Sequence, residues 1–149
     1  MFDDLYQDVI LDHSKRPRNS HPMEDANRKA EGYNPLCGDK LKLYLKLDEH
    51  DVVEDVSFTG SGCAISTASA SLMTESLKGK TREEALKLLD KFHELLTTDT
   101  PVTKDLGKLV VFCGVRDYPA RVKCATLAWH TLRSALTSGE SAPEPISTE

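Results

Sequence analysis

The residues best suited to bind a metal or to act in catalysis lie in one short stretch. Residues 34–39 read NPLCGD, which places the thiol of Cys37 and the carboxylate of Asp39 on either side of Gly38. Pro35 stops regular structure and Gly38 permits a left-handed backbone, so the two side chains can converge on one point. A thiolate and a carboxylate that converge are ligands for a divalent metal such as zinc. One such turn does not complete a four-coordinate site, so other segments must supply the remaining ligands.

Two more cysteines are expected at the starts of helices. Cys63 follows the glycine-rich sequence GSG at residues 60–62, and Cys124 is expected in the first turn of a helix just after Arg121 and Lys123. The unpaired N–H groups and the positive dipole end of a helix favour a thiolate over a thiol. With Cys37 and Asp39 these cysteines make a candidate Cys₃Asp site, tetrahedral for zinc and also usable by iron.

The alternative is that the cysteines are small buried apolar residues. Gaps of 25 and 60 residues match no short zinc-finger spacing, so spacing alone leaves both interpretations open. Cys113 falls on the apolar stripe of its helix and is predicted to be a core residue. No spaced pair is found among the histidines, which are expected mainly at the surface or as caps: His13, His21, His50, His93 and His130.

Composition restricts the class of protein. The chain has 149 residues, 39% of them hydrophobic and 29% charged, with a net charge of -5. These values predict one soluble globular domain and argue against nucleic acid as a partner, since phosphate binding normally requires a basic excess. The acidic N-terminus does not resemble a secretory signal, and the longest apolar run, residues 109–113, is too short to span a membrane. We therefore expect a cytoplasmic protein with reduced cysteines.

Hydrophobic periodicity predicts the elements that position these residues. Helical spacing extends from residue 2 to about residue 15, and residues 15–36 are expected to form a loop with at most a short helical piece at 24–30. Alternating leucines predict a strand at 41–47, which residues 48–51 connect to a second strand at 52–58; a third strand is only weakly indicated at 33–35. Helices are predicted after residue 63, after a Thr81–Glu84 capping box, after residue 101 and from 119–122 onwards.

This order of elements predicts an α+β fold, with a small antiparallel sheet of about three strands covered on one face by helices. Residues 1–138 are predicted to form a single domain. Residues 139–149 contain two prolines and no large apolar cluster, so we expect a disordered tail.

Three motifs resemble the IscU/NifU-N family of iron–sulfur cluster assembly proteins. The motifs read NPLCGD at residues 34–39, GSGCAIS at 60–66 and PARVKCATLAW at 119–129, and the similarity extends over roughly residues 2–137. Within that family the chain resembles the SufU branch. The stretch at 118–123 reads YPARVK and lacks the chaperone-recognition motif of IscU. Lys123 stands where IscU has a histidine. The interval between Cys63 and Cys124 is long, as in SufU-like proteins.

The resemblance implies a zinc ion held by Cys37, Asp39, Cys63 and Cys124. It also implies a partner, a SufS-type cysteine desulfurase with its own pyridoxal phosphate, from which Cys37 accepts persulfide sulfur for downstream iron–sulfur assembly proteins. In this branch a histidine of the desulfurase is implied to displace Cys37 from the metal. Arg121 and Lys123 are candidates for contacts with the partner. The same ligand set also fits an IscU-like scaffold that assembles and transfers a [2Fe–2S] cluster, and a third possibility is a metal-stabilised interaction module.

Overall fold

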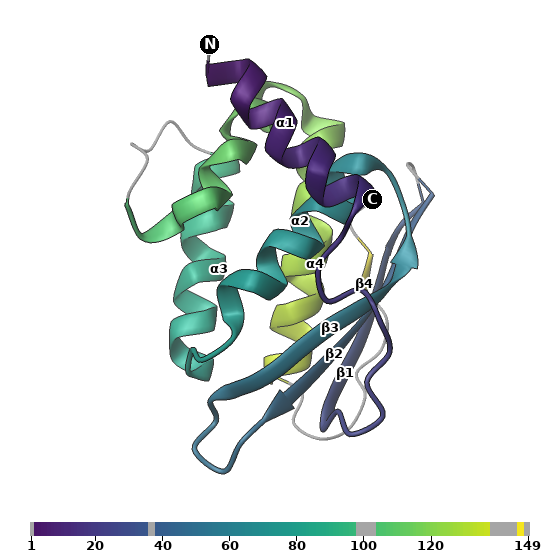
Figure 1. The fold of residues 1–149 in the computed structure, drawn as a ribbon, viewed down its shortest axis with the longest axis vertical. Coiled ribbons are helices and arrows are strands. Elements are labelled where there is room, and N and C mark those ends of the chain that lie inside the picture. Colours follow the sequence, from purple (N-terminus) through teal and green to yellow (C-terminus); the bar gives the residue numbers. More distant parts are fainter. Residues whose placement is uncertain (1, 36–37, 98–103, 138–145, 148–149) are drawn as a thin grey trace.

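One sheet and a layer of helices make up the fold (Figure 1). The computed structural model describes residues 2–35, 38–97, 104–137 and 146–147. The sheet has the strand order β3-β2-β1-β4. In chain order the elements are α1 (Phe2–Lys15), β1 (Arg28–Asn34), β2 (Asp39–Leu47), β3 (Val53–Ser61), α2 (Ala64–Leu77), α3 (Arg82–Thr97), the 3₁₀ segment η1 (Lys104–Asp117), α4 (Pro119–Thr137) and β4 (Ile146–Ser147).

The predicted hairpin and fold class are confirmed. Strands β2 and β3 pair antiparallel, and Leu41, Leu43, Leu45 and Leu47 all face the core. The Asp48 carboxylate accepts hydrogen bonds from the backbone N–H groups of His50 and Val52, which closes the turn between the strands. The helices lie on one side of the sheet, with α4 against β1 and β2 and α2 against β3 (Figure 1). This is the α+β arrangement that the periodicity predicts.

The loop predicted at residues 15–36 is wrong at its C-terminal end, because Arg28–Asn34 form strand β1. The third strand weakly indicated at 33–35 overlaps only the last two residues of β1. The inward-facing residues of this strand are Ala30, Gly32 and Asn34, all of them buried. The buried positions of this strand hold small or polar residues instead of large apolar ones. The sequence therefore lacks the alternating hydrophobic pattern that predicts a strand. The small residues are required by α4, which packs directly on this strand.

A short parallel strand completes the sheet beside β1. Gly32 and Tyr33 pair with Ile146 and Ser147 of β4. Of the tail predicted at residues 139–149, the structure describes only these two residues of β4; the others lie outside the described part of the chain. Gly32 is where the elements meet most closely, since a Cβ atom there would collide with the Oγ1 atom of Thr131 on α4 and crowd Leu127 and Ile146.

The predicted capping box at the start of α3 is confirmed. The Thr81 backbone N–H donates to Oε1 of Glu84 and the Glu84 N–H donates to Oγ1 of Thr81, each at 3.1 Å. The helix expected after residue 101 is present as η1, which is 3₁₀ in type and interrupted at Gly107 by a φ of 53°. In the core, Trp129 of α4 stacks on Phe92 of α3 with ring centroids 4.6 Å apart.

His13 does not follow the expectation of a surface histidine, because only 2% of it is exposed, between α1 and α2. Its Nδ1 atom lies 2.7 Å from Oγ of Ser71, and its Nε2 atom lies 3.5 Å from the Glu75 carboxylate. Ser71 Oγ already accepts the Arg18 backbone N–H, so its own proton is available for Nδ1. We infer the neutral tautomer protonated at Nε2. Burial lowers the pKa of His13, and the Arg18 guanidinium lowers it further.

Candidate metal centre

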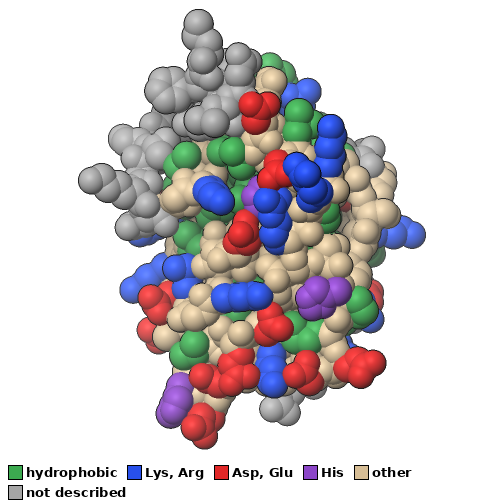
Figure 2. Space-filling view, in the orientation of Figure 1, with side chains coloured by type: hydrophobic (Ala, Val, Ile, Leu, Met, Phe, Trp, Pro, Cys, Tyr) green, Lys and Arg blue, Asp and Glu red, His purple; other side chains and the backbone are tan. Residues whose placement is uncertain are grey.

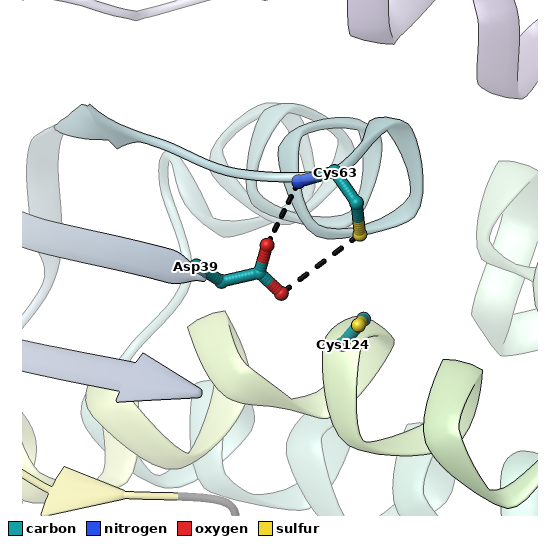
Figure 3. Close-up of side chains that lie close together, drawn as sticks. All are labelled: Asp39, Cys63 and Cys124. Atoms are coloured by element: carbon teal, nitrogen blue, oxygen red, sulfur yellow. Dashed lines mark hydrogen bonds between the residues drawn. The ribbon is translucent and has the colours of Figure 1, made fainter. Parts of the chain in front are cut away.

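Three elements bring Asp39, Cys63 and Cys124 together. Asp39 begins β2, Cys63 caps the N-terminus of α2 and Cys124 lies on α4. One ligand atom from each residue lies within 4.8 Å of the other two (Figure 3). Asp39 is 1% exposed and Cys124 3% exposed, whereas Cys63 is partly exposed. The cluster is therefore closed on the protein side and open near Cys63.

The Asp39 carboxylate is fixed by the loop that precedes α2. Its Oδ1 atom accepts the Cys63 backbone N–H at 2.8 Å, and its Oδ2 atom lies 3.8 Å from Cys63 Sγ (Figure 3). A Cβ atom on Gly62 would lie 2.6 Å from Oδ1, so a side chain there would exclude the carboxylate from this position. Gly62 is therefore part of the site although it supplies no ligand. Gly38, expected to permit a left-handed backbone, has a φ of 71°.

The cysteine at the start of α2 matches its predicted setting. Cys63 is the N-cap residue, and its sulfur accepts the Ser66 backbone N–H at 3.4 Å. An N–H donor at a helix N-terminus stabilises negative charge on sulfur. The predicted position of Cys63 at a helix N-terminus is confirmed by this contact.

The position predicted for Cys124 is wrong by about one turn. Helix α4 begins at Pro119, so Cys124 is its sixth residue rather than a first-turn residue. The helix dipole acts mainly within the first turn, so its effect on this thiol is smaller than expected. The side chain of Asn34 instead donates from Nδ2 to Cys124 Sγ at 3.6 Å, and Asn34 is fully buried. Sequence reasoning missed this role; the signal was a polar residue at the start of the NPLCGD motif.

Of the remaining predicted site residues, Arg121 and Lys123 are described by the structure, and neither joins this cluster. Cys37, the proposed fourth ligand, lies outside the described residues, as does the side chain of Cys113. Arg121 is exposed and its guanidinium lies 4.7 Å from the centre of the Tyr118 ring. Lys123 is half-buried and lines a different cavity, together with His93 and His130. Contacts of Arg121 and Lys123 with a partner therefore stay predictions.

The described donors fit a tetrahedral divalent metal. Two thiolates bound to one zinc ion lie about 3.8 Å apart, given a zinc–sulfur bond of about 2.3 Å, and a carboxylate oxygen lies slightly closer. A cluster whose ligand atoms lie within 4.8 Å of one another needs only small side-chain rotations to reach such spacing. Two sulfurs and one oxygen also suit iron, so the donor set defines a transition-metal site rather than a calcium or magnesium site.

The fold and the site define a class of protein: a small α+β domain with a cysteine–carboxylate group between its sheet and its helices that could hold a metal ion. The model of the NifU-like N terminal domain matches residues 5–125. The chain therefore belongs to this family, which includes the IscU and SufU iron–sulfur cluster assembly proteins. The sequence resemblance to IscU and NifU-N proteins is confirmed, and a SufU-type placement agrees with it.

Relatives of both types match nearly the whole chain. The iron–sulfur cluster assembly scaffold protein IscU of Streptococcus pyogenes is 45% identical over 93% of this chain and 86% of its own length. The zinc-dependent sulfurtransferase SufU of Bacillus subtilis is 43% identical over 93% of both chains. Among solved structures, a SUF-system scaffold candidate from Fervidobacterium islandicum AW-1 has a TM-score of 0.82 at 40% identity, covering 87% of this chain and 94% of its own.

Within the described residues, no helix has the length and apolar character needed to span a membrane.

Proposed function

We propose that this protein is a zinc-dependent sulfur acceptor of the SufU type, which takes persulfide sulfur from a SufS-type cysteine desulfurase for iron–sulfur cluster assembly. The observation that carries the proposal is the Asp39–Cys63–Cys124 cluster, which leaves one position of a tetrahedral site to a further ligand. Cys37 is two residues from Asp39 along the chain, so covalent connectivity keeps it within reach of that position.

The residues have distinct roles in this proposal. Asp39, Cys63 and Cys124 would hold the metal, with Cys37 as the fourth ligand, and zinc, when bound, would keep the coordinated thiols ionised and protected from oxidation. Cys37 is the nucleophile. Its thiolate attacks the terminal sulfur of the desulfurase persulfide, a new sulfur–sulfur bond forms on Cys37, and the desulfurase cysteine leaves as a thiolate. The partly exposed side of the cluster at Cys63 gives the partner access.

The sequence at 118–123 favours sulfur transfer over a scaffold role. It reads YPARVK, so the IscU chaperone-recognition motif is absent and Lys123 replaces the histidine before the last cysteine. The 43% sequence identity to a relative named as a zinc-dependent sulfurtransferase also supports the proposal. The second candidate is an IscU-like scaffold for a [2Fe–2S] cluster, because a relative named as a scaffold is equally similar and the same ligands fit iron.

The test is to purify the protein without added metal, measure its metal content, and measure sulfide release by a SufS-type desulfurase in its presence. We expect one tightly bound zinc ion per chain and faster sulfur release. Cys37→Ser is expected to abolish the stimulation, whereas Cys113→Ser serves as the matched cysteine control and is expected to keep both properties. A protein that carries a transferable [2Fe–2S] cluster and leaves the desulfurase unaffected would be a scaffold.

A further inference from the structure

A second site lies at the opposite end of α2 from the metal centre. A cavity of about 590 Å³ elsewhere borders α4, but a cavity of about 500 Å³ between α2, α3 and η1 combines charge with an apolar floor. Three lysines line it, Lys78, Lys80 and Lys108, and Leu88 and Leu106 belong to its apolar part. Figure 2 shows basic and acidic side chains interspersed on this face of the molecule. Three lysines around one cavity contrast with the net charge of -5 of the whole chain.

Hydrogen bonds to strand β3 fix the backbone that carries Lys78 and Lys80. The Gly79 N–H donates to the Val53 carbonyl at 2.9 Å, and the Lys80 carbonyl accepts the Val53 N–H at 2.8 Å, so the connection between α2 and α3 is tied to strand β3. On the opposite wall, Lys108 follows Gly107, where the backbone of η1 turns sharply. Cationic groups held on two separate elements around a cavity form a preorganised site for a negative charge.

Two of these charges are not neutralised by an ion pair. Lys78 is engaged, with its Nζ atom 3.3 Å from Asp55 and 3.0 Å from the side-chain oxygen of Asn19. Across the part of the chain that the structure describes, no salt bridge involves Lys80 or Lys108. Glu75 also lines the cavity, 3.5 Å from Nε2 of the neutral His13, so its negative charge offsets one of the three lysine charges. The cavity therefore has an excess of positive charge.

We propose that this cavity binds a small phosphate ester with an apolar body. Lys80 and Lys108, which form no salt bridge within the described residues, can both donate to the oxygen atoms of one phosphate group, while Glu75 offsets part of the positive charge. Leu88 and Leu106 line the cavity with only 6% and 5% of their surface exposed, so the organic part would contact their edges, and the volume is in the range of small-molecule sites. This site is separate from the metal centre, because α2 has 14 residues and is therefore about 21 Å long.

The test uses phenyl phosphate, inorganic phosphate and phenol as probes, added to the full chain at pH 8 and followed by NMR shift perturbation. For a ligand of this size we expect a dissociation constant on the order of 1 mM for phenyl phosphate. Binding of inorganic phosphate is expected to be weaker because it does not use the leucine floor, and phenol is expected not to bind because it lacks the charge. The shifts should appear at residues around the cavity.

Variants assign the binding to the lysines. Lys80→Gln combined with Lys108→Gln is expected to weaken phenyl phosphate at least tenfold, whereas Lys87→Gln, an exposed lysine of α3 outside the cavity, should leave it unchanged. Circular dichroism checks that each variant is folded. The alternative is that the lysines only offset the negative end of the α2 dipole. Absence of binding at 20 mM, equal loss in the Lys87 control, or full binding in the double variant would overturn the proposal.

Discussion

Asp39 has two functions at the scale of single residues. One oxygen atom fixes the backbone of Cys63 and the other faces its sulfur. A buried carboxylate with 1% exposure needs such partners, because an unpaired buried charge is costly. Through these two contacts the carboxylate connects the sheet to the start of α2, next to the candidate metal centre.

Replacement of this carboxylate should therefore affect metal binding more than folding. Asp39→Ala is expected to weaken zinc retention at least tenfold, since loss of even an outer-sphere partner of a metal ligand costs about 10- to 100-fold. Competition with a chromophoric chelator measures this. Asp39→Asn is the matched control: it keeps an oxygen for the Cys63 N–H but lacks the charge, so it should fold more stably than Asp39→Ala and still bind zinc weakly. Unchanged zinc affinity in both variants would show that Asp39 is not a ligand.

His13 makes the stability of the protein depend on pH. The pKa of His13 is lowered by folding from its ordinary value near 6.5, so the unfolded chain binds the proton more readily. The stabilising contribution is complete above about pH 6.5 and is lost as the pH falls toward the lower folded pKa, with a slope of at most about 1.4 kcal/mol per pH unit. The charges that act on the ring are Arg18, Glu75, Asp12 and Lys108.

Urea denaturation of the metal-free protein at several pH values between 5 and 8 measures this dependence. His13→Asn is expected to be less stable at pH 8 and to lose less stability on acidification than the wild type. His50→Asn is the control, because His50 is an exposed histidine in the turn between β2 and β3. Equal acid sensitivity of the His13 variant and the wild type would assign the effect to other groups.

At the scale of elements, the contact between β1 and α4 depends on Gly32. The space for a side chain is occupied by Thr131 Oγ1, which itself donates to the Leu127 carbonyl. Gly32→Ala is therefore expected to cost about 1–3 kcal/mol of unfolding free energy, as overpacking does in a dense core. Because α4 carries Cys124, the same change should also weaken zinc binding.

A double-mutant cycle tests the source of this cost. Thr131→Ala removes the atom that a Cβ at position 32 would meet, so adding it to Gly32→Ala should recover about 1 kcal/mol relative to the sum of the single changes. Chemical denaturation of the four proteins gives the coupling. Simple additivity would mean that the strand relaxes away from α4 without a clash at Thr131.

The sequence predicts elements well where hydrophobic periodicity is strong. The leucines of β2 and the capping box of α3 are examples, because each is a local signal. Only the last two residues of strand β1 were indicated by the sequence, because its inward residues are small or polar. The role of Asn34 was missed because its hydrogen bond to Cys124 joins residues 90 positions apart. The convergence of Asp39, Cys63 and Cys124 likewise depends on tertiary packing; the ligand set was implied by family resemblance, since spacing alone left inert thiols open.

For the whole molecule, the candidate metal centre joins β2, α2 and α4 at one end of the fold. A ligand that binds only the folded state stabilises it by about 4 kcal/mol when its free concentration is 1,000 times the dissociation constant. Removal of zinc with a chelator is therefore expected to lower the melting temperature by several degrees, and re-addition should restore it. Calorimetry measures the shift. Hydrogen exchange should increase most at the N-terminal end of α2 and around residue 124, and an even increase over the chain would contradict a local role.

The spacing of the three ligands also orders events during synthesis. Residues 39 and 124 are separated by most of the chain, and a ribosome makes proteins from the N-terminus at about 5–20 residues per second. The hairpin that presents Asp39 and the cap at Cys63 exist as peptide several seconds before Cys124 has been polymerised. A nascent chain therefore has an incomplete set of donors. Tight metal binding therefore requires that Cys124 has been synthesised and that α4 has packed against the sheet.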